Sequence, residues 1–328
     1  MRAISYTRFG LADEVLTLGD LPTPDPAPGE VLVRLATSGV NPSDIRARAG
    51  GRPGVTEPPF PVIVPHSDGA GVIEAVGEGV DPGRIGQRVW IWNGQWQRAF
   101  GAAAEFIALP TEQAVLLPEN VSFDVGAALG IPGMTACHAV LGGGSVEGKW
   151  VLVSGGAGTV GHLAVQVAKA SGARVLATAR DEGIAAARDA GADHVFDYSS
   201  DDLADQILEA TGGELIDRIV EVEFGQNAET DARVIAERGT IAAYGSARDM
   251  APVMPFYPLM FKAVTLDLVL VYLLDAATRG RVTGQLTALL EQEALRFRIS
   301  QTFDLADCAE AHDVVAEGTR AGSVILTV

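Results

Sequence analysis

Cysteine is scarce in this sequence. Only Cys137 and Cys308 occur among its 328 residues. Two thiols cannot build the disulfide framework of a small secreted scaffold or the four-cysteine lobe of a structural zinc site. The natural setting of such a chain is a reducing compartment.

Positive charge is scarce as well. The chain has 24 Lys and Arg residues against 42 Asp and Glu, which gives a formal net charge of -18. The resulting field repels phosphate backbones and anionic lipid, so we expect no nucleic-acid partner and no membrane partner. An anionic cofactor would need a local source of positive potential.

Long hydrophobic runs are absent. The most apolar segment, residues 263–274, contains Asp267 and is too short to span a bilayer. The first residues include no apolar core of a signal peptide. The length fits two domains, and 48% hydrophobic with 20% charged residues is a globular composition. We therefore expect a cytoplasmic enzyme or binding protein.

The chain changes character near Trp150. Before it, glycine and proline separate short β-type runs such as residues 30–35 and 71–76, which predicts a mainly β domain. After it, apolar runs alternate with helical stretches, which predicts a parallel sheet covered on both faces. The end of the chain predicts helices near 284–292 and 305–317 and a last strand at 323–328.

A glycine-rich loop follows the first strand of the second half. Gly156-Ala157-Gly158-Thr159-Val160-Gly161 is a G-x-G-x-x-G between a strand at 150–154 and an amphipathic helix at 159–171. This is the setting of a dinucleotide-binding Rossmann fingerprint. We expect Gly156 to permit the tight turn, Gly158 to admit the pyrophosphate and Gly161 to allow close helix packing. The helix N-terminus supplies the positive potential that an acidic protein lacks.

The second strand of this domain indicates which dinucleotide binds. An NAD-preferring site places Asp or Glu about 20 residues after the loop, but Ala179 stands there and Arg180 follows. An arginine can grip a 2′-phosphate, so NADPH is favoured. We expect Asp181 to cap the next helix, and we assign Thr178 and Tyr198 to the cofactor site as well.

Other segments carry a combined signature. They are Gly39-Val40-Asn41-Pro42, the glycine-rich stretch 69–77, Gly86-Gln87-Arg88-Val89, residues 128–136 and Tyr244-Gly245-Ser246. Together with the loop they resemble the medium-chain dehydrogenase/reductase superfamily and, within it, the zinc-free quinone oxidoreductases related to zeta-crystallin. The resemblance extends nearly from end to end.

The resemblance implies an α/β fold with two domains. A GroES-like β domain (1–122) is completed by a C-terminal return (275–328), and a Rossmann domain (123–274) binds NADPH. It also implies a homodimer that pairs through residues 265–274. The residues that it places beside the nicotinamide half of the cofactor are Asn41, Thr135, Tyr244, Gly245 and Ser246.

The related zinc alcohol dehydrogenases require a check for metal ligands. A catalytic zinc needs three protein ligands, and the positions that match two cysteine ligands hold Asn41 and Ile131. His66 alone stands at a ligand-like place, so we predict no metal and assign His66 to the substrate pocket or to a hydrogen-bonding role.

Without zinc, hydride transfer suits an easily reduced acceptor and needs mainly positioning. We therefore predict an NADPH-dependent quinone reductase, with Asn41 as the catalytic residue that holds the nicotinamide region or the substrate oxygen. Arg46 and Arg52 replace the tyrosines frequent in such enzymes, and Arg46 is a pocket candidate. Trp92 is a further pocket candidate or, equally, part of the domain core. Two alternatives stay open: a reductase of activated alkenes such as enones, and an NADPH-binding protein with little turnover.

Overall fold

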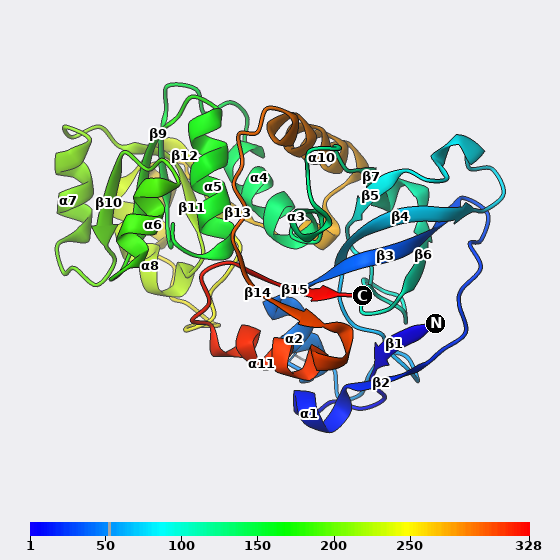
Figure 1. Cartoon of the computed structure of the whole chain (residues 1–328). Coiled ribbons are helices and arrows are strands. Elements are labelled where there is room, and N and C mark those ends of the chain that lie inside the picture. The colour runs from blue at the N-terminus through cyan, green and yellow to red at the C-terminus, as the bar shows by residue number, and fades with distance from the viewer. Residues whose placement is uncertain (52–53) are drawn as a thin grey trace. The chain divides into compact units, whose positions relative to one another are not determined.

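The computed structural model describes residues 1–51 and 54–328, and Arg52 lies outside them. The chain folds as two compact units, one from residues 1–131 and 297–328 and the other from residues 132–296 (Figure 1). The expected boundaries fall earlier in the chain because α3 (Phe123–Gly126) packs on the first unit's sheet and α10 (Ala276–Glu291) packs within the second unit.

The first unit is built around a seven-stranded, largely antiparallel sheet. The strand order is β14-β15-β3-β4-β5-β7, with β6 also paired to β3. The sheet strands are β3 Glu30–Val40, β4 Asp68–Val76, β5 Arg88–Ile91, β6 Phe106–Pro110, β7 Ala114–Leu116, β14 Ile299–Asp304 and β15 Ser323–Thr327. A separate pair joins β1 Arg2–Ser5 to β2 Thr17–Asp20.

Both ends of the chain contribute to this unit. β15 lies antiparallel to β3 with Val324 opposite Val40, so the C-terminal residues complete a sheet that begins near the N-terminus. Helices α1 Ala12–Val15, α2 Pro42–Arg48 and α11 Cys308–Glu317 belong to the same unit. The GroES-like unit made from both chain ends is confirmed.

The second unit contains a six-stranded sheet in which every pairing is parallel. The order is β10-β9-β8-β11-β12-β13, the doubly wound order of a Rossmann domain. Its strands are β8 Trp150–Val153, β9 Arg174–Ala179, β10 His194–Asp197, β11 Ile216–Glu221, β12 Ile235–Ala243 and β13 Thr265–Leu268. The predicted fold of this half is confirmed.

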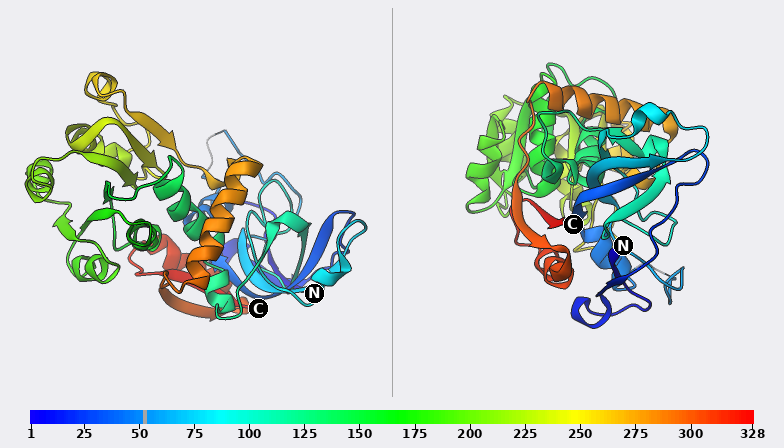
Figure 2. Two further views of the ribbon diagram at one scale, coloured as in Figure 1. Left: turned by 90° about the horizontal axis from the view of Figure 1, so that it is seen from above. Right: turned by 45° about the vertical axis from the view of Figure 1, so that its right-hand side comes forward.

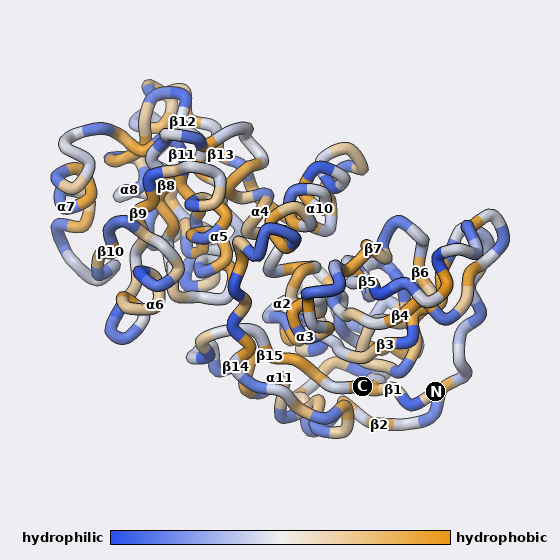
Figure 3. Tube along the Cα trace, turned by 45° about the horizontal axis from the view of Figure 1, so that its top comes forward, coloured by the Kyte–Doolittle hydropathy of each residue, from blue (hydrophilic) through white to orange (hydrophobic). Residues whose placement is uncertain are grey.

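Helices cover both faces of the parallel sheet (Figure 2). The remaining helices of this unit are α4 Met134–Leu141, α5 Thr159–Ala170, α6 Gly183–Asp189, α7 Leu203–Ala210, α8 Phe224–Val234 and α9 Phe256–Phe261. Leu152 and Ile219 of the sheet share one apolar core with α7, α8 and α9, and α5 packs against β8 and β9. Hydrophobic stretches (orange) run through this sheet (Figure 3), and β8 is buried at every position, although β11 and β12 also carry charged residues.

Short turns complete the description. They are the 3₁₀ segments Pro82–Arg84, Thr111–Gln113, Val271–Leu273 and Leu305–Asp307 and a π turn at Leu129–Gly133. Within the described residues, no helix is both long and apolar enough to cross a membrane.

The C-terminal part differs from the sequence-based expectation in two ways. Helix α10 begins at Ala276 rather than near Gly284, because the Asp275 side chain accepts a hydrogen bond from Thr278 N at 2.9 Å and caps the helix. Two glycines inside the helix, Gly280 and Gly284, hid its first half from propensity arguments. Strand β14 was not expected, and none of its residues is fully buried.

A buried carboxyl group in α8 gives the second unit a pH-dependent stability. Asp231 is 1% exposed, and its Oδ2 has no hydrogen-bond partner among the described residues. Burial, reinforced by the Glu221 charge, raises the pKa of Asp231 well above its usual range. The protonated Asp231 carboxyl therefore contributes to the stability of the fold at low pH. This contribution is complete below about pH 4, the usual pKa of an aspartate in the unfolded chain, and is lost as the pH rises through the raised pKa of the folded state.

We therefore expect Asp231→Asn to gain stability relative to the wild type as the pH increases. The difference in the free energy of unfolding should grow by up to about 1.4 kcal/mol per pH unit between about pH 4 and the folded-state pKa. Urea denaturation at several pH values measures it. A difference that stays constant with pH would show that the carboxyl group is not held neutral.

Candidate active site

The glycine-rich loop lies where the strand order of the parallel sheet reverses. It joins β8 to α5, and β8 is hydrogen-bonded between β9 and β11. In doubly wound sheets, ligands bind beyond the carboxyl ends of the strands at this point. The topology therefore places the loop at the expected cofactor position.

The glycines of this region have three different tasks. Gly156 lies in the turn that follows β8, but the left-handed backbone conformation occurs at its neighbour Gly155, with φ +69°. Gly156 also lies against the sheet, because an added Cβ would stand 2.8 Å from the Cβ of Ala177. An added Cβ at Gly161 would collide with the Gly155 carbonyl oxygen, which agrees with the expected close approach of helix and loop.

Gly158 differs from its neighbours because it is exposed. Its nearest neighbour for an added Cβ is the Gly155 oxygen at 3.4 Å, so the protein itself has room for a side chain there. Ala157, Thr159 and Val160 are half-buried around it. This open backbone at the N-terminus of a 12-residue helix fits a dinucleotide pyrophosphate.

Thr178 shapes the loop from the neighbouring strand. Its hydroxyl accepts a hydrogen bond from Gly155 N at 3.1 Å, and its carbonyl accepts one from Gly156 N at 2.8 Å. The side chain is 4% exposed. In this structure Thr178 holds the loop in place.

Arg180 follows β9 and is exposed. Its Nε lies 3.1 Å from Oδ2 of Asp181, and both side chains are more than half exposed. The prediction that Asp181 caps the next helix was wrong, because the N-cap of α6 is Glu182 and Asp181 occupies a left-handed turn with φ +51°. A phosphate at Arg180 would compete with this exposed, weak ion pair.

The remaining cofactor candidates follow the ends of other strands. Tyr198 comes after β10, is 41% exposed and donates its backbone N–H to Ala179 O at 3.3 Å. Tyr244, Gly245 and Ser246 follow β12 and are half-buried. The Ser246 hydroxyl accepts from Gly225 N at 3.0 Å.

Thr135, another expected cofactor residue, lies in α4 and is 6% exposed.

Sequence reasoning missed a buried pair beside the loop, Ser154 and Glu221. Ser154 donates its hydroxyl to Glu221 Oε2 at 2.5 Å, and Glu221 also accepts from Asn227 Nδ2 at 2.9 Å. Burial raises the pKa of Glu221. Their positions at the ends of β8 and β11 were the signal that could have revealed them.

The first unit carries a polar network centred on Asp68, which is fully buried. Its carboxylate accepts hydrogen bonds from Asn41 Nδ2 at 2.9 Å and from Ile131 N at 2.9 and 3.0 Å. The backbone N–H of Asn41 donates to Asp44 Oδ2 at 2.8 Å at the start of α2. Burial raises the pKa of Asp68, and the Ile131 hydrogen bond opposes the shift.

This network does not fit the catalytic zinc of the dehydrogenases. Asn41 and Ile131, which stand at the matching cysteine positions, supply an amide and a backbone N–H, and both donate to Asp68. These donors leave no thiolate at those two places for a metal. Asn41 itself is 5% exposed, with its amide held by the carboxylate.

Two of the three pocket candidates in the first unit are buried. His66 has no exposed surface and is hydrogen-bonded to Ser38 and His312, which agrees with the hydrogen-bonding alternative. Trp92 is 4% exposed, which agrees with the alternative that it belongs to the domain core. Arg46 is exposed on α2. Cys308 and His312, which the comparison with zinc-ligand positions did not consider, lie beside His66.

A cavity of about 140 Å³ does open in the first unit next to α2. Its lining residues are Tyr6, Phe9, Ala47, Gly50, Val55, Pro59, Ile63 and Gln95. Apart from the Tyr6 hydroxyl and the Gln95 amide the side chains are apolar, which suits a flat ring with a few polar atoms. Sequence patterns did not indicate it, because its walls come from segments far apart in the chain.

A GroES-like unit together with a glycine loop at the switch point of a Rossmann sheet defines a nucleotide-dependent oxidoreductase fold. The family models agree: "Alcohol dehydrogenase GroES-like domain" matches residues 27–119 and "Zinc-binding dehydrogenase" matches residues 159–284. The chain belongs to the quinone oxidoreductase family of the medium-chain dehydrogenase/reductase superfamily.

Full-length relatives support this assignment. The pig (Sus scrofa) quinone oxidoreductase is 32% identical and the Pseudomonas aeruginosa quinone oxidoreductase 30% identical; the matches cover 99% of this chain and 97% and 99% of those proteins. A mycobacterial structure complexed with NADPH is similar with a TM-score of 0.85 and 30% identity over 100% of both chains.

Proposed function

We propose that the protein is an NADPH-dependent quinone oxidoreductase that works without zinc. The observation that carries the cofactor assignment is the end of β9, where Ala179 stands in place of a carboxylate and exposed Arg180 follows. A carboxylate there would bind ribose hydroxyls, whereas a guanidinium can bind the 2′-phosphate. The relatives named quinone oxidoreductases support the acceptor class.

Bound NADPH supplies a hydride to an acceptor that is already easily reduced. The chain then has to bind and orient both partners rather than polarise a carbonyl strongly. Backbone amides of the loop 156–161 would hold the pyrophosphate, and Thr178 fixes the loop. Asp68 fixes the orientation of the Asn41 amide, whose oxygen can accept a hydrogen bond.

For the acceptor we assign the cavity lined by Phe9, Ala47 and Gln95. Its apolar walls favour a ring with little charge, and the Gln95 amide can donate to a quinone oxygen. Arg46, exposed on the same helix as Ala47, is a positive group for an acceptor that carries an anionic substituent.

Steady-state oxidation of NADPH against a panel of quinones and enones tests the proposed function. We expect turnover with quinones, and we expect Gln95→Ala to raise KM for the quinone more than it lowers kcat. Turnover with enones alone would assign the protein to the alkene reductases. Tight NADPH binding without oxidation in the presence of any acceptor would make it a binding protein.

We propose a cytoplasmic homodimer whose subunits pair through β13. β13 is the edge strand of the parallel sheet, and apolar residues next to it are exposed. These residues form an apolar edge: Phe256, Tyr257, Met260, Phe261, Leu268, Leu270 and Leu273. An open edge of this kind is an association site.

Light scattering during size-exclusion chromatography tests the dimer. We expect the wild type to elute with the mass of two chains and Leu268→Lys, which puts a charge on the apolar edge at a 72% exposed position, to elute as a monomer. Leu116→Lys, at a 56% exposed position of the other unit, is the matched control. A monomeric wild type would exclude the pairing.

A further inference from the structure

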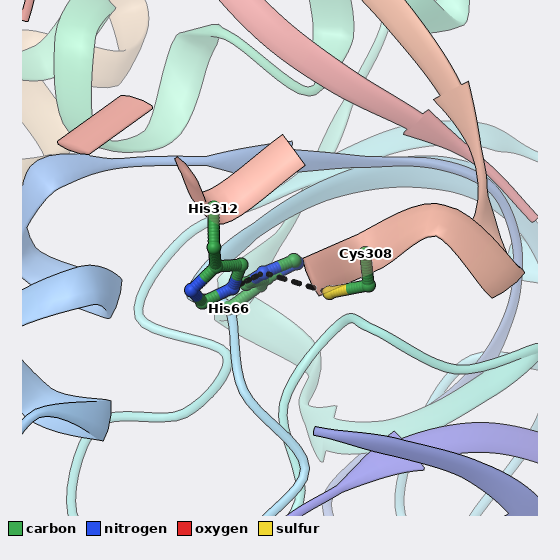
Figure 4. A group of neighbouring side chains, drawn as sticks. All are labelled: His66, Cys308 and His312. Atoms are coloured by element: carbon green, nitrogen blue, oxygen red, sulfur yellow. Dashed lines mark hydrogen bonds between the residues drawn. The ribbon is translucent and has the colours of Figure 1, made fainter. Parts of the chain in front are cut away.

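Three metal-binding side chains meet in the interior of the first unit, outside the polar network around Asn41. His66, Cys308 and His312 each have no exposed surface, and one ligand atom from each lies within 4.8 Å of the others (Figure 4). The two Nε2 atoms are 2.9 Å apart, and Cys308 Sγ is 3.9 Å from His66 Nε2. The imidazole rings are stacked, with centroids 5.1 Å apart.

The backbone is arranged so that these side chains converge. Cys308 and His312 are four residues apart in α11, so both lie on one face of the helix. His66 precedes β4 and has φ +79°, a left-handed conformation that favours glycine. A fully buried histidine in this conformation indicates that the imidazole has a specific task there.

A second layer of contacts orients His66. The Nδ1 atom lies 2.9 Å from the hydroxyl of buried Ser38, and that hydroxyl donates to Asp68 O at 3.4 Å. Metal-binding histidines are held in this way, with the second ring nitrogen hydrogen-bonded so that the first presents its lone pair.

A simple hydrogen bond between the histidines explains only part of the cluster. One proton shared by the two Nε2 atoms accounts for the two imidazoles, but it gives the Cys308 thiol only a long contact of 3.9 Å to His66. A metal ion would use both Nε2 lone pairs and the sulfur together.

We propose that His66, Cys308 and His312 bind one copper(I) ion. Two imidazoles and one thiolate form the trigonal ligand set that copper prefers in proteins. The nearest charges acting on the site are Asp44 and Arg48, one of each sign. A copper(I) ion and a thiolate add no net charge to them, whereas zinc(II) would leave a positive charge and need a fourth ligand.

The geometry requires only a small adjustment. With metal–nitrogen bonds of about 2.0–2.1 Å and a metal–sulfur bond of about 2.3 Å, the nitrogens stand about 3.4–3.6 Å apart and each about 3.6–3.8 Å from the sulfur. The imidazoles would separate by about half an ångström from their present 2.9 Å, and the 3.9 Å contact already matches. The third pair of ligand atoms, from His312 and Cys308, lies within 4.8 Å and would approach by up to about 1 Å. Binding forms one Cu–S and two Cu–N bonds, releases the thiol proton to solvent and shifts the proton between the two Nε2 atoms to the Nδ1 atom of the ring that carries it.

The proposal does not depend on the oxidoreductase activity, so copper content tests it separately. Because the site is buried, the metal should enter as the chain folds, and the protein is purified anaerobically from copper-supplemented cells. We expect one copper per chain by mass spectrometry and an X-ray absorption spectrum with two nitrogen ligands and one sulfur ligand. Competition with a chromophoric copper(I) chelator then measures the affinity.

Cys308→Ser and His312→Gln should weaken copper(I) binding at least about 100-fold. Cys137→Ser is the matched control, because Cys137 is the other buried thiol and lies in the other unit; it should keep the copper. His66→Gly, which suits φ +79°, gives a folded variant without the third ligand. Less than stoichiometric copper in the wild type, unchanged affinity in these three variants, or a site filled by zinc in copper-supplemented cells would overturn the proposal.

Discussion

The substitution Gly158→Ala is expected to lower NADPH affinity by roughly 10- to 100-fold while leaving the stability of the protein unchanged. The reason lies in the surroundings of this exposed residue. A new Cβ meets the Gly155 oxygen at an ordinary 3.4 Å, so the fold accepts it, but it stands where the pyrophosphate must approach the backbone.

Gly161→Ala is the variant to compare with Gly158→Ala. Its Cβ would collide with the backbone oxygen of Gly155, so we expect a loss of about 1–3 kcal/mol in the free energy of unfolding together with a loss of cofactor affinity. Thermal unfolding and fluorescence titration with NADPH measure the two effects. If Gly158→Ala bound NADPH as the wild type does, the pyrophosphate would not lie on this loop.

Arg180→Asp is expected to lower NADPH affinity by about 1.5–3 kcal/mol, or roughly 10- to 100-fold. The guanidinium is more than half exposed, and among the described residues its ion pair is with the neighbouring, exposed Asp181, so it is available to a 2′-phosphate. NADH has no such phosphate, and its affinity should stay the same or rise. The ratio of the two affinities, measured by titration, reports the specificity directly.

Arg188→Asp controls for net charge. Arg188 is exposed in α6 and the substitution changes the charge of the chain by the same amount. If Arg180 makes a specific contact with the phosphate, Arg188→Asp should bind NADPH with nearly the affinity of the wild type. Equal losses in both variants would mean that the general electrostatic field, not a contact, sets the affinity.

The sequence was sufficient for the architecture of the second unit. Apolar runs alternating with helical stretches implied the parallel sheet, and the loop 156–161 located its switch point. Individual tasks were less predictable. The positive φ falls on Gly155 rather than on Gly156, because a pattern of glycines does not say which one bends the chain and which one packs on Ala177.

Contacts between distant residues were beyond the sequence. Asp68 lies 63 residues from Ile131, and His66 lies 246 residues from His312, so no local pattern connects them. The sequence left open whether His66 and Trp92 line a pocket or lie in the interior, because burial decides that question and depends on the folded sheet. The residues that line the cavity near Gln95 were missed for the same reason.

Calorimetric titration of the purified wild-type protein with NADPH and NADH tests the central claim most directly. We expect one site per chain and an affinity for NADPH at least about ten times that for NADH, since one ion-paired phosphate contributes about 1.5 kcal/mol or more. Absence of heat with NADPH, or equal affinity for the two dinucleotides, would contradict the assignment of the loop and of Arg180.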